Sequence, residues 1–187
     1  MTERWAAIDF ETATREPNSA CALGVALVED DRIVETLSWL IRPPFNEYEF
    51  WNTNVHGISA EDTEFAPEFD EVWWEVRQVL EGTRLLAHNA PFDMRVLRAL
   101  FESREIDAPH YEYACTLAIA RKVLPELPRH TLDVVCDHCG IRLVHHDAAS
   151  DAEGCARIAV DCIERTQTDS ISSALEQLGV PLRGLLP

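Results

Sequence analysis

Two carboxylates near the N-terminus have the spacing of metal ligands. Asp9 and Glu11 end an apolar run that begins at Trp5. If this run is a strand, both carboxylates leave the same face and Phe10 points to the other, with the two acidic Cα atoms about 6.6 Å apart. Such a pair can bind one divalent cation or bracket two, and oxygen ligands favour magnesium or manganese. The alternative is two surface carboxylates at a strand end.

A third candidate carboxylate lies where an apolar strand is expected to give way to a helix. Residues 86–93 read LAHNAPFD, and the last of them, Asp93, falls in the first turn of the expected helix. The helix dipole favours a negative charge at that position. Asp93 is therefore either a stabilising first-turn acid or a further ligand.

The fourth candidate carboxylate begins a long helical pattern near the C-terminus. Residues 145–156 read HHDAASDAEGCA, which places Asp151 on the helix face that also carries Cys155 and Cys162. A carboxylate on an apolar face needs a partner, and metal coordination is a common one. His146 precedes this helix on a segment that could bend over the site, although a structural role is the simpler interpretation of a lone histidine.

Together the three motifs resemble the DEDDh subgroup of the DnaQ-like 3′–5′ exonucleases, which includes the proofreading epsilon subunit of bacterial DNA polymerase and ribonuclease T. The order is Asp-x-Glu, then His-Asn-Ala-x-Phe-Asp, then His-x-Ala-x-x-Asp. The histidine stands five residues before Asp151, whereas the tyrosine subgroup has a tyrosine four residues before, and position 147 here is aspartate. The resemblance covers about residues 5–165, and segments 55–59 (VHGIS) and 130–133 (HTLD) also look like family landmarks.

The resemblance implies an α/β fold with a ribonuclease H-like mixed β-sheet flanked by helices. It implies that two divalent cations, Mg²⁺ or Mn²⁺, are held by Asp9, Glu11, Asp93 and Asp151. His146 would accept a proton from the attacking water, and 5′-mononucleotides would be released from 3′ ends. The implied contacts to the terminal nucleotide are Thr12, His56, Gly57, Ile58 and Asn89.

The motifs are compatible with more than one substrate and partner. Single-stranded or frayed DNA is favoured, because residues 9–13 (DFETA) are closer to the polymerase-associated branch. An exoribonuclease that trims short RNA is the alternative, and the treatment of the 2′-hydroxyl would decide between them. A catalytically silent, polymerase-associated binding module is a third hypothesis. A polymerase partner is possible but not implied, and the short C-terminal tail favours a free-standing enzyme.

The elements needed to position these residues can be read from the hydrophobic pattern. Polar residues 29–32 separate two apolar runs, which predicts a hairpin. We predict strands at 5–11, 20–28, 33–42, 84–87 and 111–115. Helices are expected to begin near residue 59, to span about 67–82, and to occupy 92–101, 116–123, 131–139, 148–165 and 170–178. Strands that first meander and then alternate with helices indicate a mixed sheet.

Composition limits the class of protein. The 187 residues carry 16 Lys and Arg against 33 Asp and Glu, a net charge of −17. This length predicts one domain, with a core over about residues 5–165 and a helical tail over 166–187. We expect no membrane span and no signal peptide, and scattered cysteines fit reduced thiols in a cytoplasmic protein. Such acidity argues against a protein that coats long nucleic acid by charge alone, but not against an enzyme that handles one nucleic-acid end in a metal-filled pocket.

Other patterns favour structural roles. Cys136 and Cys139 form a CxxC pair, but a structural zinc site needs four ligands, so we expect buried thiols on a helix face. The arginines after Asp93 at positions 95, 98 and 104 are expected on an exposed helix face, with phosphate contact as the alternative. Neighbouring side chains on an extended segment point in opposite directions, so His145 is expected to face outward or pack locally.

Overall fold

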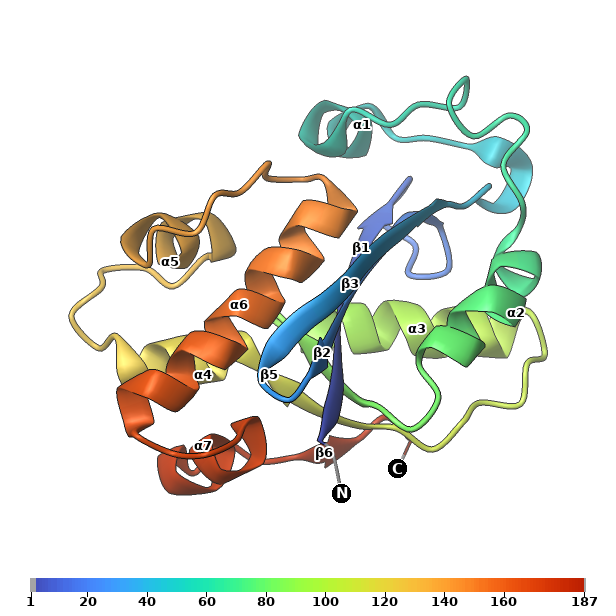
Figure 1. Cartoon of the computed structure of the whole chain (residues 1–187). Coiled ribbons are helices and arrows are strands. Elements are labelled where there is room, and N and C mark those ends of the chain that lie inside the picture. Colours follow the sequence, from blue (N-terminus) through green and yellow to red (C-terminus); the bar gives the residue numbers. More distant parts are fainter. Residues whose placement is uncertain (1–2, 187) are drawn as a thin grey trace.

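A six-stranded mixed sheet forms the centre of the protein, as shown by a computed structural model that describes residues 3–186 (Figure 1). The strand order is β3-β2-β1-β4-β5-β6. β1 pairs antiparallel with β2 and parallel with β4, and β5 pairs parallel with β4 and antiparallel with β6. The strands are β1 (Arg4–Thr12), β2 (Ala20–Glu29), β3 (Arg32–Leu40), β4 (Arg84–Ala87), β5 (Glu112–Cys115) and β6 (Arg183–Gly184).

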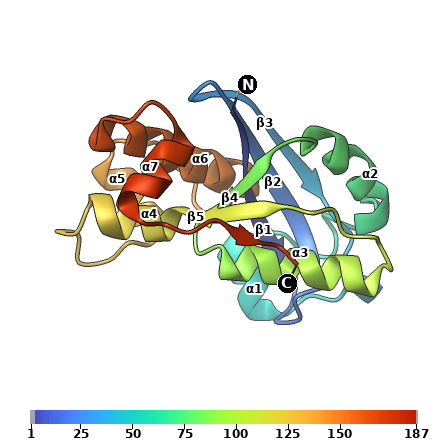
Figure 2. The same ribbon diagram turned by 90° about the horizontal axis from the view of Figure 1, so that it is seen from below.

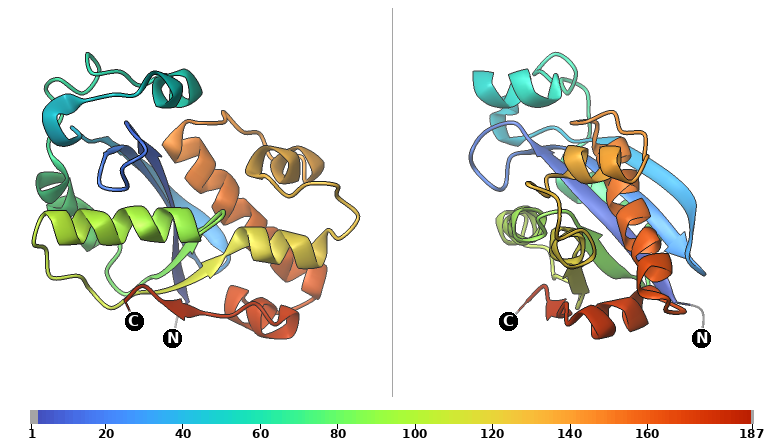
Figure 3. Two further views of the ribbon diagram at one scale, coloured as in Figure 1. Left: turned by 180° about the vertical axis from the view of Figure 1, so that it is seen from behind. Right: turned by 90° about the vertical axis from the view of Figure 1, so that its left-hand side faces the viewer.

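Helices cover both faces of this sheet (Figures 2 and 3). α2 and α3 pack on one face, whereas α4, α6 and α7 pack on the other, with α5 against α6. The helices are α1 (Phe50–His56), α2 (Phe69–Val79), α3 (Pro91–Ser103), α4 (Thr116–Val123), α5 (Leu132–His138), α6 (Ala148–Thr166) and α7 (Ile171–Leu178). The predicted ribonuclease H-like α/β architecture is confirmed. None of the described helices has the length and apolar character needed to cross a bilayer.

Alternation along β1 decides where its carboxylates point. Ile8 and Phe10 belong to the core beneath α2 and α3, whereas Trp5 and Ala7 belong to the core beneath α6. Since strand residues alternate between faces, the carboxylates at positions 9 and 11 continue the row that faces α6. The sequence prediction that Phe10 points away from them is confirmed.

The N-terminal end of α6 lies directly on β2. A Cβ atom built on Gly24 of β2 would stand 1.8 Å from the carbonyl oxygen of Ala148, the first residue of α6. Only glycine allows the backbone of α6 to approach this closely. Gly24 therefore sets the position of the helix turn that carries Asp151.

The segment after residue 166 is an integral part of the fold. Ile171 and Leu175 of α7 are buried in the core beneath α6. Beyond α7 the chain adds strand β6 to the edge of the sheet, and the backbone N–H of Leu185 donates to the carbonyl oxygen of Tyr111 at 2.8 Å. The predicted helical tail thus also contains a strand, which the sequence pattern did not indicate.

Most predicted elements are confirmed, with differences around the first loop. No helix begins near residue 59, where the chain makes turns. The helix predicted over 67–82 begins at Phe69 after an N-cap at Glu68, which forms a capping box with Glu71. The strand predicted over 33–42 ends at Leu40. Helix α1 and a 3-10 turn at Pro44–Asn46 were not expected.

Candidate active site

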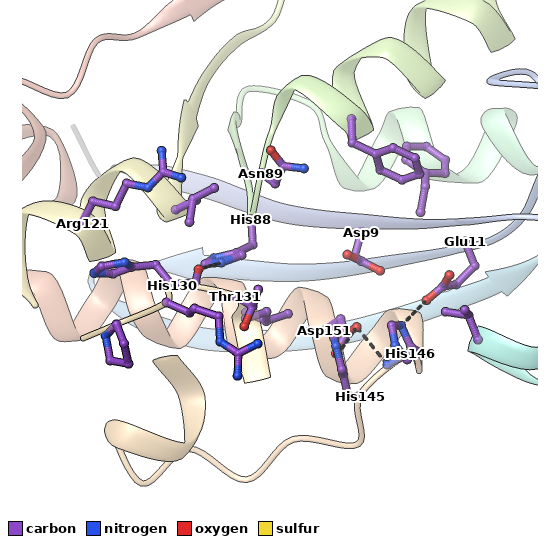
Figure 4. Close-up of a pocket in the computed structure, with 17 residues that line it drawn as sticks. Asp9, Glu11, His88, Asn89, Arg121, His130, Thr131, His145, His146 and Asp151 are labelled. Carbon is purple, nitrogen blue, oxygen red and sulfur yellow. Dashed lines mark hydrogen bonds and ion pairs between the residues drawn. The ribbon is translucent and has the colours of Figure 1, made fainter. Parts of the chain in front are cut away.

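Three of the four predicted carboxylates converge at the end of β1. Asp9 and Glu11 come from β1, and Asp151 comes from the first turn of α6 (Figure 4). One oxygen from each lies within 4.8 Å of the others. Three carboxylates at this separation repel one another unless a cation or protons neutralise them.

The fourth carboxylate, Asp93, is buried behind this cluster in the first turn of α3. Its side chain is 1% exposed, and its Oδ1 accepts a hydrogen bond from the backbone N–H of Phe10 at 3.1 Å. Asp93 does not belong to the group of oxygens within 4.8 Å. Its charge nevertheless raises the pKa values of Asp9 and Glu11.

The electrostatics of the cluster favour a bound cation. Burial, followed by the charges of Asp151 and Asp93, raises the pKa of Glu11 to about 8. Burial and then the charge of Asp93 raise the pKa of Asp9 well above its ordinary value. A buried set of hard oxygen donors that resist ionisation matches the ligand preference of magnesium or manganese. The residues present therefore fit a divalent cation.

Two adjacent histidines face the carboxylates from the loop before α6. The Nδ1 atom of His145 lies 3.1 Å from Oδ2 of Asp151, and Nδ1 of His146 lies 3.9 Å from Oε1 of Glu11. The backbone N–H of His146 donates to the same Asp151 oxygen at 3.0 Å. Of the two expectations for His145, an outward position and local packing, the structure shows local packing against Asp151, because His146 has a φ of +66° and the segment is not extended.

His146 is suited to remain neutral. Burial, followed by the neighbouring His145, lowers the pKa of His146 below its ordinary value. A neutral imidazole can accept a proton, whereas a protonated one cannot.

Helix α1 is fastened to the end of β1 by polar contacts with Thr12. Asn52 donates through Nδ2 to the carbonyl oxygen of Thr12 at 2.8 Å. The backbone N–H of Ile58 donates to Nδ1 of His56 at 3.1 Å, so Nε2 of His56 carries a proton and donates to the same Thr12 oxygen at 3.2 Å. Gly57 ends the helix with a φ of +77°. His56 thus holds α1 in place.

Three of the five predicted nucleotide-contact residues line two adjoining cavities. Asn89 lines the main cavity, which has a volume of about 830 Å³ and includes the three clustered carboxylates and both histidines. His56 and Ile58 line a neighbouring cavity of about 380 Å³ that also includes His145 and His146. Thr12 and Gly57 line neither of these two cavities.

The main cavity continues beyond the carboxylates to a second, basic end. Figure 4 shows Arg121 and His130 at the end opposite Glu11. Nε2 of His88 donates to the carbonyl oxygen of His130 at 2.8 Å, and burial lowers the pKa of His88 to about 4. The sequence pattern did not single out Arg121 or Arg129, which also lines the cavity. The only sequence signal there is the HTLD segment that begins at His130.

The motifs assigned structural roles differ from expectation in exposure, because Cys139 is half-buried rather than buried and Arg98 and Arg104 are half-buried rather than exposed. Cys136 is buried, the Cys139 thiol lies 3.7 Å from a carboxylate oxygen of Asp161, and all six cysteines are free. No candidate metal cluster within residues 3–186 includes a cysteine. Arg98 donates to the carbonyl oxygen of Leu185 and Arg104 pairs with Glu68, so both make contacts within the protein.

Comparison with known protein families agrees with this geometry. The family model RNase_T, described as an exonuclease, matches residues 6–159. The PolC-type DNA polymerase III of Oceanobacillus iheyensis is 34% identical over 124 residues, covering 66% of this chain and 9% of that protein. The Thermotoga petrophila protein of the same name is 29% identical over 174 residues, covering 90% and 12%. The chain therefore spans about a tenth of these polymerases.

Solved structures share the fold at low identity. Exonuclease X in complex with 5′ overhanging duplex DNA superposes with a TM-score of 0.72 at 21% identity, covering 91% of this chain and 98% of that one. The nuclease domain of 3′hExo, a DEDDh family member bound to rAMP, gives a TM-score of 0.75 at 17% identity, with coverage of 97% and 96%.

Proposed function

The chain belongs to the RNase_T family of exonucleases, and we propose that it removes nucleotides from the 3′ ends of single-stranded or frayed DNA, releasing 5′-mononucleotides. The observation that carries this proposal is the convergence of oxygens from Asp9, Glu11 and Asp151 within 4.8 Å, at one end of an 830 Å³ cavity. A scissile phosphate is an anion, so it can enter this acidic end only together with cations.

Asp9, Glu11, Asp93 and Asp151 would hold two divalent cations in this proposal. When bound, the cations would neutralise the phosphate, acidify a water and stabilise the departing 3′ oxygen. His146 would accept a proton from the attacking water at a ring nitrogen, which its lowered pKa supports. His145 would orient Asp151 through their 3.1 Å contact.

DNA is the favoured substrate because the relatives of highest similarity described above are DNA polymerases. RNA is the second candidate, supported by the fold shared with a DEDDh nuclease domain that binds rAMP. A catalytically silent binding module is disfavoured, because confining four carboxylates without a cation costs folding free energy. The proposal does not require a polymerase partner. We also propose a cytoplasmic location for the protein, which its six free cysteines support.

Incubation with end-labelled oligonucleotides tests the proposal. DNA and RNA of one sequence are incubated with manganese, with magnesium and with excess chelator, and the products are separated by length. We expect stepwise shortening from the 3′ end that stops in chelator, with DNA degraded faster than RNA. A circular single-stranded DNA is the matched control, and its cleavage at the rate of the linear form would contradict an exonuclease.

A further inference from the structure

The main cavity is electrically polarised along its length. Carboxylates from β1 and α6 line one end, and Arg121 of α4 lies at the other (Figure 4); Arg129 of the following loop also lines the cavity. A cavity that served the terminal nucleotide alone would need only the acidic end and its cations. The basic end therefore calls for a second anionic group on the same ligand.

Among the residues that the structure describes, Arg121 and Arg129 have no acidic partner. Arg4, Arg84 and Arg104 are examples of arginines that form ion pairs elsewhere on the surface. Within residues 3–186, Arg121 and Arg129 form neither an ion pair nor a side-chain hydrogen bond, although the chain has 33 acidic residues for 16 basic ones. Their guanidinium groups remain available for an external anion.

A smaller cavity extends this basic region onto the C-terminal strand. It has a volume of about 260 Å³ and shares Asn89, Leu117 and Arg121 with the main cavity. Its far wall includes Arg183 of β6, which also forms no ion pair among the described residues. The family match ends at residue 159, so Arg183 belongs to a part of the chain that the family model does not cover.

We propose that Arg121 and Arg183 bind backbone phosphates of the strand upstream of the 3′-terminal nucleotide. The substrate would run from the carboxylate end, past Asn89, across the start of α4 and towards β6. The ligand is the phosphodiester backbone of a single-stranded nucleic acid. This inference rests on the proposed function and adds the direction of the strand and two residues that position it.

The net charge makes these arginines more important than two surface cations would normally be. A chain with a charge of −17 repels a polyanion at long range. Because guanidinium groups bind phosphate oxygens with charge-assisted hydrogen bonds, a short basic track beside the site offsets this repulsion locally. Such a track reaches a few nucleotides only, which predicts low processivity on long strands.

Length-dependent kinetics test the inference on the full chain. The variants are Arg121→Gln, Arg183→Gln and the double variant, and the matched control is Lys122→Gln, an exposed neighbour on α4 that lines neither cavity. The substrates are oligothymidylates of two to eight nucleotides and the p-nitrophenyl ester of thymidine 5′-phosphate, which has no upstream phosphate.

We expect the double variant to raise KM for the octamer about tenfold with little change in kcat. The ester should be hydrolysed at the wild-type rate, and the salt dependence of log(kcat/KM) should weaken by about 0.7 for each lost phosphate contact. An equal loss on ester and octamer, or an equal loss in Lys122→Gln, would overturn the inference. So would altered inhibition by thymidine 5′-monophosphate with unchanged length dependence, since the arginines would then hold the product.

A binding measurement separates this inference from the proposed function. Fluorescence anisotropy of a labelled octamer in chelator measures binding without hydrolysis. If wild-type protein hydrolyses neither substrate, the proposed function fails. Weaker octamer binding by the double variant, but not by Lys122→Gln, would still support phosphate binding by Arg121 and Arg183. Equal octamer binding by wild type, the double variant and Lys122→Gln would refute phosphate binding by Arg121 and Arg183, whatever the activity of the protein.

Discussion

The imidazole rings of His145 and His146 stack on each other, with centroids 3.8 Å apart and planes inclined by 24°. Consecutive residues place their side chains on one side in this way because His146 adopts a left-handed conformation. Both rings therefore face the carboxylates, one beside Asp151 and the other beside Glu11. Their different partners predict different consequences when each is removed.

Replacing His146 should remove the proton acceptor and leave the proposed cation ligands in place. We expect His146→Ala to lower kcat about 10²- to 10⁴-fold, while manganese still raises the melting temperature. The pKa of His146 is lowered from 6.5, the ordinary value for histidine. The wild-type rate should therefore rise with pH and become constant already below pH 6.5, and the variant should not show this rise. An active His146→Ala variant would refute the assignment.

Replacing His145 should act through Asp151. His145 is the side chain that contacts Asp151 at 3.1 Å, and loss of a residue that orients a ligand typically weakens metal affinity about 10- to 100-fold. We expect His145→Ala to need more manganese for half-maximal activity and to recover most of its kcat at saturation. A kcat loss as large as that of His146→Ala at saturating manganese would reverse the two roles.

Replacing Asp9 should have opposite effects on the stability of the metal-free protein and on the rate of hydrolysis. Asp9 is buried among like charges, so Asp9→Ala should raise the melting temperature of metal-free protein while lowering the rate about 10³-fold or more. The increase in melting temperature that manganese gives the wild type should shrink in the variant, because a ligand that binds only the folded state stabilises it. Wild-type turnover in Asp9→Ala would contradict the proposed ligand set.

The stability of metal-free protein should fall as pH rises. The folded pKa of Glu11 is about 8, above its ordinary 4.5, so the folded state holds more protons than the unfolded state between these values. The contribution of Glu11 to the free energy of unfolding is therefore greatest below about pH 4.5 and is lost as pH rises towards 8. Thermal melts in chelator at pH 5 to 8 should show the decline, and Glu11→Gln should flatten it.

Adding a methyl group at Gly24 should displace α6. The new Cβ would meet the backbone carbonyl of Ala148 at 1.8 Å, which cannot move without shifting the helix. We expect Gly24→Ala to lose about 3 kcal/mol or more of unfolding free energy, measured by denaturant titration, together with most activity. Gly154→Ala is the matched control, since its Cβ meets the end of the Leu143 side chain at 2.8 Å and should be tolerated better.

The elements that build the core could be predicted because their buried residues are apolar and recur at the period of a strand or a helix. The alternation in β1 and the spacing of Phe69, Val72, Trp73 and Val76 in α2 both follow from burial. Within α2, Trp73 is buried and Trp74 is exposed. An element that is buried on one face has apolar residues at regular intervals, so its position can be read from the sequence. The candidate metal ligands lie on elements of this kind, β1, α3 and α6.

Helix α1 and strand β6 could not be predicted for the same physical reason. No residue of α1 is buried, so its sequence has no apolar period, and contacts from Asn52 and His56 to Thr12 hold it in place. β6 has two exposed residues and exists because its backbone pairs with β5. The left-handed turn at His146 likewise carries no sequence signal, since histidine is not a residue that requires a positive φ.

The position of β6 also determines how one of the two edges of the sheet is protected. A sheet ends in a strand with unpaired N–H and C=O groups, and such an edge can recruit the same strand from another molecule. β6 covers β5 and is only two residues long, which leaves little edge to extend. A chain cut at residue 159, where the family match ends, would expose β5 and lose Ile171 and Leu175 from the core. We expect such a fragment to aggregate, so the segment beyond the family boundary protects this edge of the sheet.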